Sequence, residues 1–165
     1  MPDMHNVFMS HYSGDVQRLR HLKGRLAANG CVVRNSSAEE DRDGGLVRRG
    51  HRVSDATIAR YLRAGIKWAK TFIVIIGEHT HERQWVNYEI RQAYLQGKQI
   101  IGIYDHGCQN NVELPEAYKR YGGSPIGWNS LDKLAGMLNG EVPIPEAPDG
   151  TPSGPIHNMI HIVCK

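Results

Sequence analysis

The sequence predicts a single α/β domain: a flavodoxin-like, doubly wound parallel sheet of about five strands in the order 2-1-3-4-5. Short apolar segments alternate with amphipathic segments of helical period, which is typical of strand–helix–strand units with right-handed crossovers. Residues 71–76 are apolar on both faces, as central parallel strands are. A length of 165 residues suits one hydrophobic core.

Local patterns place each element of this fold. The expected strands are 6–10, 31–34, 71–76, 99–104 and a weak fifth strand at 125–128. Helices are expected after four capping positions: Ser13 or Asp15, Ser54 or Asp55, Thr80, and Ser130. The third helix should run to about Gln96, where Gly97 ends it, and the last should reach Leu138. We expect no internal repeat.

Two segments lack helical or strand periodicity. Residues 35–54 combine a mixed charge run, a Gly-Gly pair and an arginine cluster, so we expect a long loop that serves as a lid or contact surface. Residues 1–139 should form the domain. Residues 140–165 should form a linker rich in proline and glycine, followed by a short apolar segment.

Composition excludes several classes of protein. A hydrophobic fraction of 40% and a charged fraction of 22% are ordinary for globular proteins. The net charge of +3 comes from scattered residues, so we expect no nucleic-acid partner. We expect no membrane span, because the longest apolar run, 72–76, is too short. Three cysteines far apart in the sequence indicate a reduced, cytoplasmic protein.

The predicted topology selects two loops for ligand binding. Ligands in such sheets bind at the carboxyl ends of strands one and three, here residues 10–15 and 77–82. On the helix that follows, Trp85 and Glu89 are four residues apart and share one face. A carboxylate beside an indole at this place would be partly desolvated, which makes it a functional candidate. The alternative is a surface glutamate that pairs with a nearby arginine.

Other chemistries find less support in the sequence. His79, His81 and Glu82 lack an HExxH-type spacing, so we expect no metal site. No P-loop or GxGxxG motif follows the first strand. Cys31 lies within a strand, which favours a buried structural thiol. A phospho-receiver domain would need an aspartate at the end of strand three, where Gly77 stands.

Several ordered blocks together resemble a known family. They are Val7–His11, Asn35–Ser37, Ile58–Ile66, Phe72–Gly77 and Gln84–Ile90. They resemble TIR domains and, more narrowly, the TIR-like family of ThsB, the sensor protein of bacterial Thoeris anti-phage systems. The resemblance extends from about residue 5 to residue 105, and residues 106–165 resemble no family that we can name.

The resemblance implies a set of site residues. In enzymatic TIR domains the glutamate of the WxxxE pattern is catalytic, and Glu89 occupies that position here, with Trp85 as the aromatic. The candidates for substrate contact are Phe8, Ser10, His11, Ser36, Ser37, Trp85 and Tyr88. Phe8 as a core residue and the serines as turn formers are the alternatives.

The resemblance also implies a reaction. NAD would be a substrate and not a bound cofactor, and the carboxylate would stabilise the oxocarbenium-like state formed when the nicotinamide–ribose bond breaks. We expect a cyclic or conjugated ADP-ribose that activates a separate effector as a diffusible messenger. We also expect a homo-oligomer that completes the nucleotide site across protomers. The alternative is a non-catalytic TIR-like scaffold that acts through oligomerisation.

Overall fold

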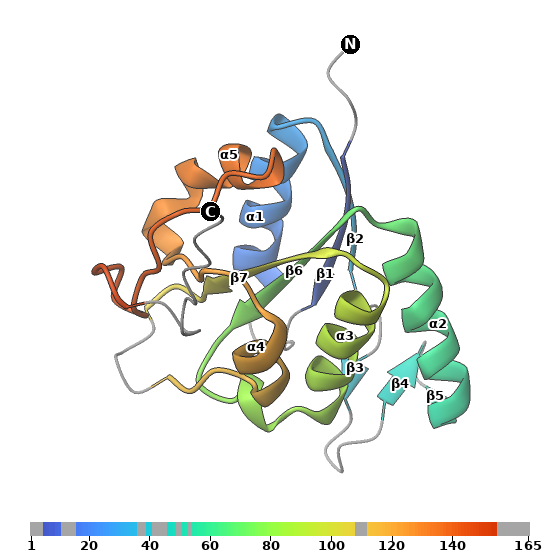
Figure 1. Cartoon of the computed structure of the whole chain (residues 1–165). Coiled ribbons are helices and arrows are strands. Elements are labelled where there is room, and N and C mark those ends of the chain that lie inside the picture. Colours follow the sequence, from blue (N-terminus) through green and yellow to red (C-terminus); the bar gives the residue numbers. More distant parts are fainter. Residues whose placement is uncertain are drawn as a thin grey trace, which may run out of the picture.

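A four-stranded parallel sheet is the centre of the protein (Figure 1). The computed structural model describes residues 5–10, 16–35, 39–40, 46–48, 51–52, 54–107 and 112–154. The strand order is β2-β1-β6-β7, and all three neighbouring pairs are parallel. The strands are β1 (His5–Ser10), β2 (Cys31–Asn35), β6 (Thr71–Ile76) and β7 (Gln99–Tyr104). This order confirms the predicted doubly wound fold for its first four strands.

Helices cover both faces of the sheet. The α-helices are α1 (Val16–Ala28), α2 (Asp55–Trp68), α3 (Gln84–Leu95), α4 (Glu116–Tyr121) and α5 (Leu134–Leu138). In Figure 1, α1 and α5 lie on one side of the sheet, and α2, α3 and α4 lie on the other. Helix α2 begins where predicted, because the Ser54 hydroxyl accepts a hydrogen bond from the Thr57 amide.

Successive side chains of β1 point to opposite faces of the sheet, and each face has its own core cluster. Val7 and Met9 pack with Leu22 and Leu26 of α1, whereas Phe8 packs with the residues of α2 and α3. All six residues of β6 are buried, which confirms it as a central strand. Cys31 is buried in the core cluster that contains the α1 residues. Burial raises the pKa of its thiol, which agrees with the predicted structural role of this cysteine.

The predicted fifth strand is reduced to one bridge. Ile126 pairs in parallel with Ile103, donates its amide to Gly102 and accepts from the Tyr104 amide. The ladder stops there because Pro125 has no amide hydrogen and the 3-10 helix η2 (Trp128–Lys133) begins two residues later. The last helix is therefore η2 followed by α5, so Ser130 does not cap it.

The segment 35–54 contains more regular structure than predicted. Its described parts form a small antiparallel sheet of β3 (Glu39–Glu40), β4 (Leu46–Arg48) and β5 (His51–Arg52). These strands are two or three residues long, too short for alternation to be recognised in the sequence. The function of this segment as a lid or contact surface stays a prediction.

The segment after α5 is held against the domain by one buried carboxylate. Glu146 is 3% exposed and accepts hydrogen bonds from the Gly127 amide (3.0 Å), the Ser130 hydroxyl (2.8 Å) and the Lys133 ammonium (3.2 Å). Its own amide donates to the Pro125 carbonyl. The division of the chain at residue 139 stays a prediction, and residues 155–165 lie outside the described part.

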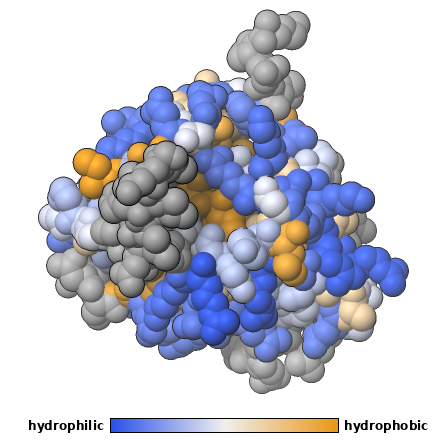
Figure 2. All heavy atoms as spheres, in the orientation of Figure 1, coloured by the Kyte–Doolittle hydropathy of each residue, from blue (hydrophilic) through white to orange (hydrophobic). Residues whose placement is uncertain are grey.

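The surface in Figure 2 is mostly hydrophilic, and apolar residues gather in a hollow near the centre of that face. Among the described residues, no helix is both long enough and apolar enough to cross a membrane. The buried apolar residues of the helices belong to the two core clusters on either side of the sheet.

We predict that Gly65→Ala destabilises the protein by about 1–3 kcal/mol. A Cβ atom at residue 65 of α2 would lie 2.7 Å from Cε2 of Phe8, a ring that is itself stacked on Phe72 and has no space to move. Urea unfolding measures the effect. Gly24→Ala in α1 is the control: its Cβ meets nothing within 4 Å, so it should stabilise by about 0.5–1 kcal/mol. Equal effects of both substitutions would contradict this packing.

We also predict that the stabilising effect of Glu146 depends on pH. Burial acts to raise the pKa of this carboxyl, but the hydrogen bonds from Ser130, Gly127 and Lys133 and the charge of Lys133 outweigh burial and lower it. The folded pKa is below the unfolded one, so Glu146 stabilises the fold above pH 4.5, and that stability is lost as the pH falls through the folded pKa.

Thermal unfolding of the wild type and of Glu146→Gln, measured from about pH 7 to about pH 3, tests this dependence. The difference in stability between the two proteins should shrink on acidification. A difference that stays constant or grows would contradict the lowered pKa.

Candidate functional site

The carboxyl ends of β1 and β6 meet at one edge of the sheet. Ser10, the last residue of β1, is in register with Val74 of β6, which ends two residues later at Ile76. Helix α3 follows β6 and packs on the sheet over β6 and β7. The first turns of α3 therefore lie at the carboxyl ends of β1 and β6, where the winding of the sheet reverses and where the sequence predicts ligand binding.

The loop between β6 and α3 differs from the prediction. Thr80 does not cap the long helix: its hydroxyl accepts from the Gly77 amide (2.8 Å) and belongs to a separate 3-10 helix, η1 (Thr80–Glu82). Helix α3 begins at Gln84 with Arg83 as its N-terminal cap residue. Trp85 is consequently in the first turn of α3, and Glu89 is one turn further along.

Glu89 is a buried carboxylate. Its exposed fraction is 3%, and it belongs to the buried stripe of α3, whose members are Trp85, Val86, Glu89, Ile90 and Ala93. A glutamate is rarely this buried, because the charged form loses its hydration. The alternative of an exposed surface glutamate is therefore wrong, and a buried acid at the switch point of the sheet is a strong functional candidate.

Ser10 is the second buried polar group at this edge. Its exposed fraction is 0%, and within the described part of the chain its hydroxyl oxygen has no hydrogen-bond partner. Ser10 is two residues after Phe8 on β1, so both side chains point to the face that α2 and α3 cover. A buried hydroxyl without a partner is costly and marks a place where a ligand can supply the missing hydrogen bond.

Two aromatic residues frame the start of α3. The rings of Trp85 and Tyr88 meet edge to face, with centroids 5.3 Å apart at 79°. The Tyr88 hydroxyl accepts a hydrogen bond from Nη1 of Arg63 on α2, at 3.1 Å. This arrangement restricts the orientation of both rings, so the indole beside Glu89 has a defined position.

Phe8 lies deeper than an open substrate wall would. Its ring is 1% exposed and stacks on Phe72, with centroids 5.8 Å apart. It belongs to the same core cluster as Trp85. The structure thus makes Phe8 a core residue, the alternative considered for it, and contact between Phe8 and a substrate stays a prediction. Three further candidates, His11, Ser36 and Ser37, lie outside the described residues and stay predictions.

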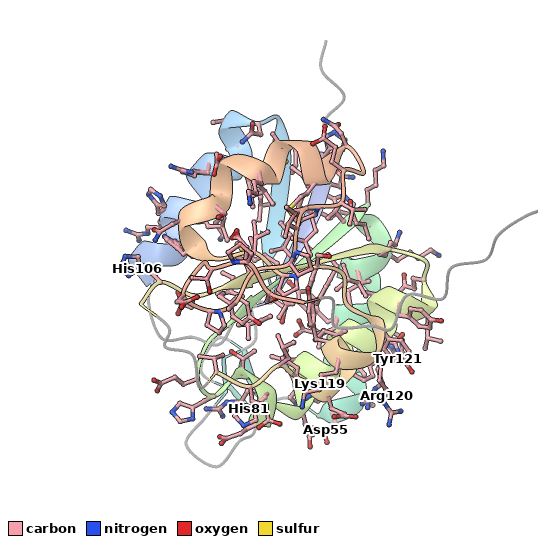
Figure 3. All side chains as sticks on the ribbon, turned by 60° about the vertical axis from the view of Figure 1, so that its left-hand side comes forward. Asp55, His81, His106, Lys119, Arg120 and Tyr121 are labelled. Atoms are coloured by element: carbon pink, nitrogen blue, oxygen red, sulfur yellow. The ribbon has the colours of Figure 1, made fainter. Side chains whose placement is uncertain are left out.

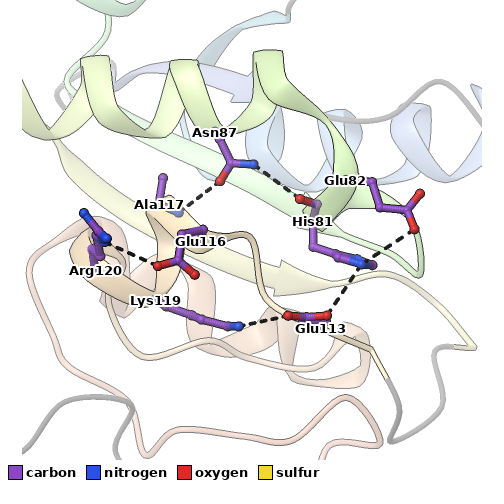
Figure 4. Close-up of polar contacts among 8 residues, drawn as sticks. All are labelled: His81, Glu82, Asn87, Glu113, Glu116, Ala117, Lys119 and Arg120. Atoms are coloured by element: carbon purple, nitrogen blue, oxygen red, sulfur yellow. Dashed lines mark hydrogen bonds and ion pairs between the residues drawn. The ribbon is translucent and has the colours of Figure 1, made fainter. Parts of the chain in front are cut away.

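The imidazole of His81 lies near two glutamates (Figure 4). Nε2 of His81 lies 3.7 Å from Glu82 and 3.6 Å from Glu113, and Glu113 also pairs with Lys119 at 3.0 Å. The Lys119 hydrogen bond and charge, with a contribution from His81, lower the pKa of Glu113. Among the described residues, no group of three or more histidine, cysteine, aspartate and glutamate side chains is placed to hold a metal ion.

Asn87 joins the segments around the site. Its Nδ2 donates to the carbonyls of His81 (3.3 Å) and Arg83 (3.1 Å), and its Oδ1 accepts from the Ala117 amide (2.9 Å), as Figure 4 shows. One side chain thus ties η1, α3 and the start of α4 together. Our sequence analysis missed this residue because its partner Ala117 is 30 positions away in the sequence.

Comparison with known proteins identifies relatives of this chain. Residues 8–110 match the family described as Thoeris protein ThsB, TIR-like domain. The chain is 34% identical over 99 residues to a protein of Bacillus cereus (strain MSX-D12) named Putative cyclic ADP-D-ribose synthase ThsB1. The aligned region is 59% of this chain and 50% of that protein, so the chain spans about half the length of this curated relative.

Solved structures that resemble this chain do so at low sequence identity. A 2-deoxyribosyltransferase from Bacillus psychrosaccharolyticus superposes with a TM-score of 0.57 at 17% identity, covering 90% of this chain and 98% of its own. The TIR domains of the activated Roq1 resistosome give a TM-score of 0.41 at 16% identity, over 61% of this chain and 57% of that one. The first superposition agrees with the doubly wound fold described above.

We predict that Asn87→Ala lowers the free energy of unfolding by about 1–3 kcal/mol, because it removes three hydrogen bonds and leaves the Ala117 amide without its acceptor. Urea unfolding checks this value. Asn29→Ala is the control, since Asn29 makes one exposed bond to the Arg25 carbonyl and should cost at most about 0.5 kcal/mol. If the two variants were equally stable, Asn87 would not join these segments as described.

Proposed function

The chain belongs to the family of TIR-like domains of the Thoeris protein ThsB, and from this premise we propose that it processes NAD. In this proposal the chain cleaves the nicotinamide–ribose bond and forms a cyclic or conjugated ADP-ribose signal in defence against phage. NAD is the substrate in this proposal, and the reaction uses no cofactor.

One observation carries the proposal: the buried carboxylate of Glu89 beside Trp85 at the carboxyl edge of β1 and β6. It supports catalysis because burial of an acid costs hydration energy, whereas an enzyme gains a strong electrostatic group at the ligand-binding edge of the sheet. The matching residue of the WxxxE pattern is catalytic in enzymatic TIR domains.

The proposed reaction begins with departure of nicotinamide. The bond between its nitrogen and C1′ of the ribose breaks, both electrons leave with nicotinamide, and C1′ becomes positively charged. The Glu89 carboxylate stabilises that charge or binds the ribose hydroxyls, and it acts strongly because it is shielded from water. Nicotinamide departs as a neutral molecule, so no general acid is needed.

The other site residues have supporting roles in this proposal. Ser10 supplies a hydrogen bond to the ribose or the carboxamide, and Trp85 and Tyr88 provide aromatic surface beside Glu89. Contact between buried Phe8 and the substrate is part of the same proposal. We place His11, Ser36 and Ser37 at the same site from the family resemblance alone.

The product depends on what attacks C1′. Attack by water gives ADP-ribose, whereas a nitrogen or hydroxyl of the same molecule gives a cyclic isomer, which requires that water be excluded. The name of the Bacillus cereus relative, a putative cyclic ADP-D-ribose synthase, supports the cyclic product. We propose that this product is a diffusible messenger for a separate effector and that a homo-oligomer completes the nucleotide site.

We predict that Glu89→Gln lowers the rate of nicotinamide release from NAD by at least about 100-fold, because it removes the charge that stabilises the oxocarbenium-like state. Liquid chromatography with mass spectrometry would measure nicotinamide and all ADP-ribose species, in buffer and in phage-infected lysate. The fold should be retained, since glutamine has nearly the same shape.

Glu116→Gln is the matched control. Glu116 is a 67% exposed glutamate on α4 whose partner is Arg120, so this variant should release nicotinamide at the wild-type rate. Equal release from the wild type and Glu89→Gln would disprove the role of Glu89. Linear ADP-ribose as the sole product of a fully active reaction would disprove the messenger.

A further inference from the structure

A cavity of about 240 Å³ lies beyond the end of β7. Three segments that are far apart in the sequence form its walls: residues 105–107, which follow β7, residues 127–129 at the start of η2, and residues 148–150. The side chains that matter for its chemistry are Asp105, His106, Trp128, Asn129 and Asp149. Nothing in the reaction proposed for Glu89 uses this cavity.

The walls of the cavity are firmly held. Buried Glu146 ties the third segment to the second through the Gly127 amide and the Ser130 hydroxyl. A Cβ atom at Gly127 would lie 3.1 Å from the Cα of Gly150, so the two backbones approach closely and a side chain at residue 127 would force Gly150 to shift. The cavity is therefore a formed feature of the fold.

The cavity is separate from the Glu89 site. Trp128 packs against the core cluster of α1 and α5, whereas Trp85 belongs to the cluster on the other face of the sheet. In Figure 3, His106 lies at the edge of the molecule, apart from His81 of η1 and Lys119 of α4. Two of the three walls lie beyond residue 110, where the family match ends.

The size and the aromatic wall indicate a flat ligand. A volume of about 240 Å³ is below the range of about 300–1,000 Å³ for drug-sized ligands, so it holds one ring system and not a dinucleotide. The half-buried Trp128 indole packs against the core cluster of α1 and α5, which restricts its position, and it lies near two exposed imidazoles, His106 at 6.4 Å and His21 at 6.2 Å between centroids. A fixed indole presents a flat surface on which a base can stack.

The polar groups indicate which edge that ring presents. The Asn129 amide offers a donor and an acceptor, the pairing that asparagine makes with adenine. Ionised carboxylates accept hydrogen bonds only: Asp105 accepts from the His106 amide, and Asp149 accepts from the amide and the hydroxyl of Thr151. Two carboxylates disfavour a phosphate and favour a ring with N–H donors.

We propose that this cavity binds the base of a purine nucleoside, stacked on Trp128, with its N–H edge toward Asn129 and the carboxylates. The base could come from a free nucleoside or from the adenosine end of a dinucleotide that extends into solvent. The proposal does not depend on the activity of Glu89.

Titration of the full 165-residue chain with adenosine and, separately, with NAD tests the proposal by calorimetry and by the NMR shift of the Trp128 indole N–H. Adenosine should bind and move that signal. Trp128→Leu should weaken binding at least about tenfold, whereas Trp128→Phe keeps a ring and should weaken it less. When both affinities are taken from the Trp128 signal, tighter binding of adenosine than of NAD identifies a free nucleoside, and the reverse identifies the dinucleotide.

Trp68→Phe at the end of α2 and Glu116→Gln on α4 are the controls, and both should leave adenosine binding unchanged. The NMR measurement on the wild type needs no substitution, so the test survives if a Trp128 variant fails to fold. The proposal is overturned if neither adenosine nor NAD moves the Trp128 signal at millimolar concentration. It is also overturned if Trp128→Leu, correctly folded, binds adenosine as the wild type does.

Discussion

Strand β6 has no exposed face, and this constraint determines where the functional residues lie. All six of its residues are buried, so it must pair on both edges, with β1 on one side and β7 on the other. The register places Ser10 beside Val74 and Tyr104 beside Ile76. Parallel pairing then brings the carboxyl ends of β1, β6 and β7 to one edge, where both the Glu89 site and the Trp128 cavity are found.

Among the described residues, the two buried glutamates have different surroundings. Glu146 receives hydrogen bonds from a backbone amide, a hydroxyl and an ammonium group, which compensate for burial and lower its pKa. Such a carboxylate is a structural tie. Glu89 lies in an aromatic and aliphatic stripe beside a loop-lined edge, and burial there gives a group suited to act on a positive charge that forms next to it.

Local periodicity predicted the structural features that depend on residues close together in the sequence. The spacing of Trp85 and Glu89 placed them on one face of a helix, and the apolar run 71–76 predicted a central strand; both are confirmed. Contacts between distant residues left no such signal. The tie from Asn87 to Ala117 spans 30 positions, and Glu146 reaches Gly127 over 19, so α4 and the ordered segment around Glu146 were missed. The predicted fifth strand is reduced to one bridge because Pro125 lacks the backbone N–H that pairing with a neighbouring strand needs.

A structure of the Glu89→Gln variant with intact NAD would test the central claim most directly, because loss of the carboxylate should preserve the substrate. The account predicts the nicotinamide–ribose bond beside residue 89, with Trp85 against the nicotinamide ring and the Ser10 hydroxyl within hydrogen-bond distance of the ligand. NAD bound with its nicotinamide end away from residue 89 and from the carboxyl edge of β1 would contradict the account.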